Sequence, residues 1–135
     1  MSTRSRIGLQ LANGSVLSVY CHWDGYPEFN GVKLVEYHNS FQKAAGLIDG
    51  GDISALHTNL GWDREVLPTT GPLYYSDRGE VSFEPRLDAN LAEYLSDGEE
   101  YAYLFTDGKW VCYNMNHFND NKLPEVVAIP VPVAA

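Results

Sequence analysis

Alternation of apolar and polar residues predicts a β-hairpin at the N-terminal end of the chain. Residues 6–11 alternate, and an apolar run resumes over residues 16–23. The pair at 13–14 between them is Asn-Gly, which favours a type I′ turn. We therefore expect two antiparallel strands joined by a tight turn.

The same pattern returns near the C-terminal end. Residues 101–105 and 110–115 are rich in aromatic and branched side chains, and residues 106–109 between them contain Asp-Gly, another strong turn signal. This predicts a second hairpin. The tail at 124–135 is rich in Pro and Val, and its prolines confine it to a sheet edge or a docked arm in extended form.

Helical spacing dominates the region after the first hairpin. Residues 31–37 predict a short helix, and residues 41–49 predict a second, with Ser40 as its N-cap. Residues 52–56 are expected to add one further helical turn. Residues 57–71 contain Gly, Asp, Pro and Thr without a clear period, which is typical of a long surface loop.

The remaining elements are short. Residues 73–76 and 81–83 are predicted strands, and 87–95 a helix with Asp88 as a possible cap. Hairpins at both ends with helices between them predict one α+β domain over residues 1–135. We expect a mainly antiparallel sheet built from the two hairpins, with two or three short helices on one face.

Length and composition are those of an ordinary globular domain. The 135 residues include 44% apolar and 20% charged side chains, and a chain of this size needs no disulfide or metal to hold a core. No segment has the roughly 20 consecutive apolar residues of a membrane span, and the first eight residues lack the apolar centre of a secretion signal. We expect a cytoplasmic protein without membrane contact.

The net charge of the chain is more unusual than its composition. Acidic residues outnumber basic ones by 18 to 9, which gives a formal net charge of −9. Between residues 77 and 107 there are nine acidic residues and two arginines. Such a field repels phosphate backbones and attracts basic protein surfaces, so it disfavours direct nucleic-acid binding. The alternative is a solvated acidic face that only aids solubility.

Histidine chemistry has one candidate position. His22 and Asp24 lie two residues apart on one strand face, where they could ligate one ion if a third ligand converged on it. The sequence identifies no third ligand, so we expect no bound metal and no cofactor. A small metal- or histidine-dependent hydrolase at His22 and Asp24 is kept as an alternative.

Cysteine chemistry is not indicated either. Cys21 and Cys112 stand in apolar, strand-like segments, which predicts two buried free thiols. Alternation places Cys21 on one face with Trp23, directed to the core, and His22 on the other face with Tyr20, so Cys21 and His22 do not form a catalytic pair. The chain also lacks a nucleophile elbow, a Walker loop and an H-E-x-x-H motif. We predict that it is not an enzyme.

Aromatic and acidic residues together indicate a protein-binding surface. The chain has nine tyrosines and three tryptophans, and such rings are common anchors at interfaces. A basic partner would meet aromatic anchors surrounded by carboxylates. The residues predicted to contact it are Tyr26, Trp62, Asp77, Glu80, Glu84, Asp97, Glu99 and Glu100.

Several stretches resemble a family of small acidic proteins encoded by tailed bacteriophages and prophages. HWDGYP at 22–27, GDIS at 51–54 and DRGE at 77–80 are the most recognisable, and the similarity continues to DGKWVCYN at 107–114. The resemblance implies a viral origin. It implies no activity, cofactor or catalytic residue.

These observations lead to one preferred function and two alternatives. We expect a phage accessory protein that binds and modulates or inhibits a host protein with a basic surface, of the kind that handles nucleic acid in restriction, CRISPR defence or transcription. The hydrolase at His22 is one alternative. A structural component of the virion, which predicts a defined oligomer, is the other.

Overall fold

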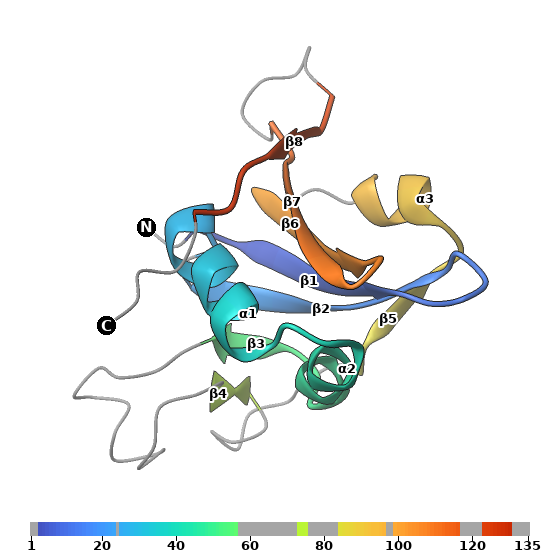
Figure 1. Ribbon diagram of the computed structural model, residues 1–135, viewed down its shortest axis with the longest axis horizontal. Helices are drawn as coiled ribbons and strands as arrows, with labels where there is room; N and C mark the ends of the chain where they lie inside the picture. Colours follow the sequence, from blue (N-terminus) through green and yellow to red (C-terminus); the bar gives the residue numbers. More distant parts are fainter. Residues whose placement is uncertain are drawn as a thin grey trace.

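The protein folds as an eight-stranded mixed sheet with helices on both faces (Figure 1). The computed structural model describes residues 3–23, 25–56, 73–75, 84–96, 99–116 and 123–130. The strands are β1 (Ser5–Gln10), β2 (Val16–Trp23), β3 (Ile53–Ala55), β4 (Leu73–Tyr74), β5 (Arg86–Asp88), β6 (Tyr101–Thr106), β7 (Lys109–Asn114) and β8 (Glu125–Val127). The helices are the π-helical turn η1 (Pro27–Gly31), α1 (Val32–Tyr37), α2 (Phe41–Asp49) and α3 (Leu91–Leu95). The α+β prediction is confirmed.

The two predicted hairpins lie side by side in the centre of the sheet. The strand order is β4-β3-β2-β1-β6-β7-β8, with β5 also paired to β2. β1 and β6 pair in parallel, with Ser5 opposite Tyr101 and Leu9 opposite Phe105. β2 and β3 form the second parallel pair, and the other five pairs are antiparallel. The sheet is therefore mainly antiparallel, as predicted.

The outer edge of β2 is shared by two short strands. β5 pairs with the first half of β2, at Val16 to Ser18, and β3 pairs with Cys21 and Trp23 near its end. Residues 52–56 were predicted as a helical turn, and this is wrong. The strand forms because β2 offers an unpaired edge there, which outweighs local propensity in so short a segment.

One face of the sheet is covered by α1 and α2. Ser40 caps α2 as predicted, its Oγ accepting from the backbone N–H of Lys43 at 3.1 Å. The buried side of α2 presents Ala44, Leu47 and Ile48 to the sheet. They join a cluster that includes Ile7, Leu9, Val19, Leu34, Ile53, Tyr103, Phe105, Trp110 and Cys112. This cluster is the main core.

The opposite face of the sheet is covered by α3. The helices α1 and α2 lie together on the first face, as expected of two short helices. Tyr94 of α3 is 1% exposed and packs with Val16, Ala102, Leu104 and Met115. The predicted helix at 87–95 is too long, because its first residues form β5 and α3 begins after Asn90. Asn90 is the cap, with its Oδ1 accepting from the N–H of Glu93 at 2.9 Å. The carboxylate of Asp88 instead accepts from Arg86 Nε at 3.1 Å.

The two hairpin turns differ in type. Asp107 and Gly108 have φ of 51° and 77°, as the predicted type I′ turn requires. In the first hairpin only Gly14 has a positive φ, at 88°, and its N–H donates to the carbonyl of Leu11. Ser15 lies opposite Leu11, so the loop has three residues, and the Asn-Gly type I′ prediction is wrong. The hairpin itself is confirmed.

The C-terminal tail forms the outer strand of the sheet and then docks. β8 pairs with Cys112 to Asn114 of β7, and the tail continues as an arm over the main core. Ile129 lies against Gly31, where an added Cβ would come within 3.0 Å of its side chain. This confirms the predicted edge position and docked arm as far as residue 130, and residues 131–135 lie outside the described residues. The predicted loop at 57–71 and strand at 81–83 lie outside the described residues.

Within the part of the chain that the structure describes, no helix is long and apolar enough to cross a bilayer.

Candidate functional site

The structure describes four of the eight residues predicted to contact a partner. Glu84 is exposed just before β5, while Glu99 and Glu100 are half-buried just before β6. β2 and β1 separate β5 from β6, a distance of roughly 14 Å at ordinary strand spacing. Glu84 therefore lies apart from the other two carboxylates. Tyr26 is 36% exposed. Outside the described residues lie Trp62, Asp77, Glu80 and Asp97.

Arg4 contacts both carboxylates at the start of β6. Its Nε lies 4.0 Å from Oε2 of Glu99, and its backbone N–H donates to Oε2 of Glu100 at 3.2 Å. The N–H of Glu100 donates back to the carbonyl of Arg4, also at 3.2 Å. The guanidinium offsets part of the negative charge at Glu99, and the backbone hydrogen bond holds the carboxylate of Glu100 in place. A partner would have to compete with Arg4 for these carboxylates.

His22 lies beside this corner, paired with Tyr20 on the strand face predicted for both. The Tyr20 hydroxyl is 2.6 Å from Nδ1 of His22, and the His22 ring meets Trp23 edge-on at 4.9 Å. Trp23 was predicted to face the core, but it is 37% exposed. The reason is that β1 begins at Ser5, opposite Cys21, so Trp23 extends beyond the end of its neighbour.

The electrostatic setting keeps both members of this pair neutral near pH 7. Burial, followed by the positive charge of Arg4, lowers the pKa of His22. Burial, followed by the negative charge of Glu99, raises the pKa of Tyr20 to about 12. Tyr20 therefore acts as donor, and the neutral ring of His22 accepts at Nδ1 and carries its proton on Nε2. The arrangement holds the imidazole in one tautomer and leaves Nε2 directed away from Tyr20.

A metal at this position would need further ligands. Asp24, the predicted companion of His22, lies outside the described residues. Among the residues whose positions are described, no three His, Cys, Asp or Glu side chains gather closely enough to hold an ion.

The corner after β2 is fixed by buried hydrogen bonds. The Tyr103 hydroxyl donates to the carbonyl of Gly25 at 2.6 Å, and the N–H of Gly25 donates to the carbonyl of Thr3 at 2.7 Å. Asn30, fully buried, donates through Nδ2 to the carbonyl of Trp23 at 3.2 Å. This network holds the chain rigidly where β2 turns into η1. It thereby positions the side chains that η1 and α1 present to solvent.

A row of three aromatic rings and one lysine follows η1 and α1, with Tyr26 and Tyr37 exposed and Phe29 and Lys33 half-buried. Its members are Tyr26, Phe29, Lys33 and Tyr37, and we call it the aromatic stripe. The rings of Tyr26 and Phe29 are 6.4 Å apart, and Lys33 Nζ lies 5.8 Å from the Phe29 ring and 5.6 Å from that of Tyr37. Tyr37 is 48% exposed. Pre-ordered aromatic rings of this kind are typical anchors for a protein partner.

Carboxylates flank the aromatic stripe. Glu28 is exposed between Tyr26 and Phe29, and Glu36 forms an ion pair with Lys33 at 3.6 Å. Sequence reasoning selected Tyr26 alone from this surface. The spacing of three or four residues between successive members is a helical period, and it is the signal that could have identified the other three.

Both cysteines are buried and free, as predicted. They stand on β2 and β7, three strand positions apart, so roughly 14 Å separates them at ordinary spacing and no disulfide can form. Burial raises the pKa of Cys112 to about 12, which suppresses the thiolate. Cys112 is therefore a core residue and a poor nucleophile.

No family model matches the chain, and comparison with curated proteins and with solved structures likewise finds no significant match.

Proposed function

We propose that the protein is a phage accessory factor that acts in the host cytoplasm by binding a host protein with a basic surface, and that the aromatic stripe is its principal contact. The observation that carries the proposal is the ordered row of rings on η1 and α1, exposed at Tyr26 and Tyr37 and held by the buried corner at Gly25. Rigid, exposed rings lose little conformational entropy on binding, which favours affinity.

Charge supports a basic partner. The chain carries a net charge of −9, and two carboxylates, Glu28 and Glu36, lie beside the single ammonium of Lys33. Such a surface attracts lysine- and arginine-rich proteins over long range and speeds their association. A nucleic-acid-handling protein has that kind of surface. A host component of restriction, CRISPR defence or transcription is therefore the proposed partner class.

The corner at Glu99 and Glu100 has a secondary role in this proposal. Arg4 already offsets part of its charge, and exposed ion pairs contribute little, about 0–1 kcal/mol. We assign these two carboxylates to electrostatic steering. The aromatic stripe provides the short-range contacts.

A pull-down from a bacterial host lysate tests the proposal. The double variant Tyr26→Ala/Tyr37→Ala is expected to retain less than about a tenth of the captured partner, because tyrosines that become buried in an interface are common hot spots. Phe41→Ala is the matched control, since Phe41 is an exposed ring (54%) on α2 outside the stripe, and it should capture the partner normally. Glu99→Lys/Glu100→Lys should reduce capture mainly at low salt.

Two results would contradict it. Equal capture by wild type and the stripe variant would show that the aromatic stripe does not contact the partner. Capture that does not change between low and high salt would remove the basic-partner assignment.

The two alternatives have separate tests. A hydrolase would contain stoichiometric metal or lose a measurable activity in His22→Ala, whereas the binding proposal expects His22→Ala to capture the partner normally. A virion component would form a defined oligomer, which light scattering detects.

A further inference from the structure

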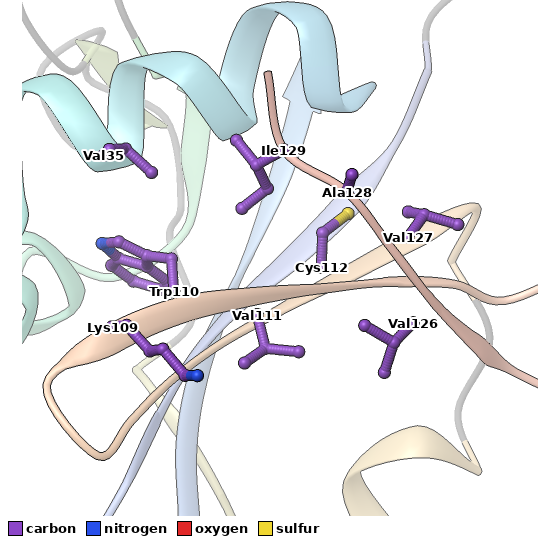
Figure 2. Close-up of a pocket in the computed structure, with 9 residues that line it drawn as sticks. All are labelled: Val35, Lys109, Trp110, Val111, Cys112, Val126, Val127, Ala128 and Ile129. Atoms are coloured by element: carbon purple, nitrogen blue, oxygen red, sulfur yellow. The ribbon is translucent and has the colours of Figure 1, made fainter. Parts of the chain in front are cut away.

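A groove lies where the C-terminal arm leaves the sheet (Figure 2). β8 pairs with β7 only from Cys112 to Asn114, and the following residues turn away toward η1. The gap between this arm and the first half of β7 has a volume of about 330 Å³. The residues that line it are Val35 from α1, Lys109, Trp110, Val111 and Cys112 from β7, Val126 and Val127 from β8, and Ala128 and Ile129 from the arm.

The register of the β6–β7 hairpin determines which backbone groups face this groove. The two-residue turn makes Thr106 and Lys109 a hydrogen-bonded pair, so the pairs alternate and Leu104 with Val111 is the next bonded pair. The N–H and C=O of Trp110 therefore point away from β6, toward the side that β8 has left. One donor and one acceptor of β7 face the groove.

The side chains that line the groove on the two faces of β7 are mainly apolar. Figure 2 shows Val35, Trp110 and Ile129 on one side of β7, and Val111 and Val126 on the other. A strand edge with an apolar pocket beside it is the arrangement that binds an extended peptide, in which backbone hydrogen bonds give affinity and alternate side chains give specificity. A volume near 330 Å³ is small for a drug-sized ligand and holds one or two side chains.

Charge around the groove selects the kind of peptide. Two exposed acidic residues, Asp107 and Glu125, lie two positions and one position along the chain from the lining residues Lys109 and Val126, and the chain as a whole has a net charge of −9. A second copy of this chain would bring another net charge of −9 and be repelled. A basic segment is attracted.

We propose that this groove binds an extended segment of the partner protein, with an apolar residue flanked by basic ones, added as a strand to the edge of β7 at Trp110. The assignment of the segment to the partner rests on the proposed function. The groove itself is a separate contact from the aromatic stripe, which lies on η1 and the outer side of α1.

The first test needs no ligand. Hydrogen exchange of the free protein, followed by NMR, should show the Trp110 amide exchanging at least about ten times faster than the Val111 amide, which is bonded to Leu104. The two amides are neighbours on one strand, so each is a control for the other. Equal protection would mean that the edge of β7 is already occupied, and would overturn the proposal.

The second test uses a displayed library of linear 12-residue peptides as the probe. Enriched peptides should carry an apolar residue between Lys or Arg residues and should slow exchange of the Trp110 amide. Ala128→Trp fills the mouth of the groove at an exposed position and should weaken their binding at least about tenfold. Ala12→Trp, at an exposed turn residue, is the matched control and should bind normally.

The outcomes separate the two proposals. If enriched peptides protect Trp110 but the host lysate yields no partner, the groove stands and the proposed function fails. If the partner is captured equally by wild type and Ala128→Trp, the groove proposal fails and the stripe remains. Peptides that bind without protecting Trp110, or formation of a dimer that Ala128→Trp abolishes, also overturn it.

Discussion

The two faces of the sheet differ in how much buried apolar side chain covers them. Under α1 and α2, fourteen described residues form one buried apolar cluster that reaches from β3 across to β7. Under α3 the buried cluster has five. Beyond α3 the same face becomes polar, with Arg6 Nε donating to Ser18 Oγ at 3.1 Å and Tyr20 paired with His22.

This difference places the main source of stability and the cluster of titratable side chains on opposite faces of the sheet. Burial of apolar area is the main source of stability, so the face under α1 and α2 contributes most of it. The face under α3 is the one on which titratable side chains, Arg4, His22 and Glu99, come together. The outer side of α1 then carries the aromatic stripe on a rigid support.

The largest expected effect tests the unequal contribution of the two faces. Leu34→Ala, at a fully buried position of α1, should destabilise the protein by about 2–5 kcal/mol. Leu91→Ala, at a half-buried position of α3, should cost less than half as much because water already reaches that side chain. Urea unfolding followed by circular dichroism measures both. Equal losses would show that the α3 face contributes as much as the other.

A second effect of intermediate size tests how closely α3 approaches the sheet. A Cβ added at Gly8 would lie 2.9 Å from Cζ of Tyr94 and 3.0 Å from Val16 Cγ1. The Tyr94 ring cannot easily move, since its hydroxyl donates to the carbonyl of Tyr103 at 2.7 Å. Gly8→Ala should therefore cost about 1–3 kcal/mol in urea unfolding.

Gly46→Ala provides the matched control for Gly8→Ala. Apart from its chain neighbours and the backbone of its own helix, no atom of the described residues lies within 4 Å of a Cβ added at Gly46, which is on the exposed side of α2, and alanine favours helix over glycine by about 1 kcal/mol. This variant should be at least as stable as wild type. If Gly8→Ala behaved in the same way, α3 would not be packed against β1 as the structure shows.

Local signals account for the parts of the fold that the sequence predicted. Alternation and an X-Gly turn located both hairpins, and Ser40 located the start of α2, because each signal acts over a few residues. β3 and β5 have three residues each, and they are strands only because β2 lies beside them. The parallel pairing of β1 with β6 joins distant segments, which no local pattern specifies.

The candidate site shows the same limit. Exposure of Tyr26 and the shared face of Tyr20 and His22 follow from local geometry and were predictable. The hydrogen bond from the backbone N–H of Arg4 to Glu100 spans 96 positions of the sequence, and the guanidinium of Arg4 lies 4.0 Å from Glu99, so the sequence could not show that these acidic residues have a cationic neighbour. Counting charges along the sequence overestimated the free negative charge at Glu99 and Glu100 for that reason.

The smallest expected effect concerns the polar end of the α3 face, where burial and then Arg4 lower the pKa of His22. The pKa of His22 in the folded protein therefore lies below its unfolded value of about 6.5. As the pH falls through that value, the unfolded chain binds a proton at His22 more readily than the folded protein does. His22 therefore lowers the free energy of unfolding as the pH falls below about 6.5. Arg4→Gln removes one of the two causes and should raise the His22 pKa part of the way back, which NMR titration of the ring Cε1–H measures. Lys33→Gln removes an equal charge at the aromatic stripe, away from this corner, and should leave the His22 pKa nearly unchanged. Equal shifts in both variants would mean that His22 responds to net charge alone and that the Arg4 corner has no local influence on it.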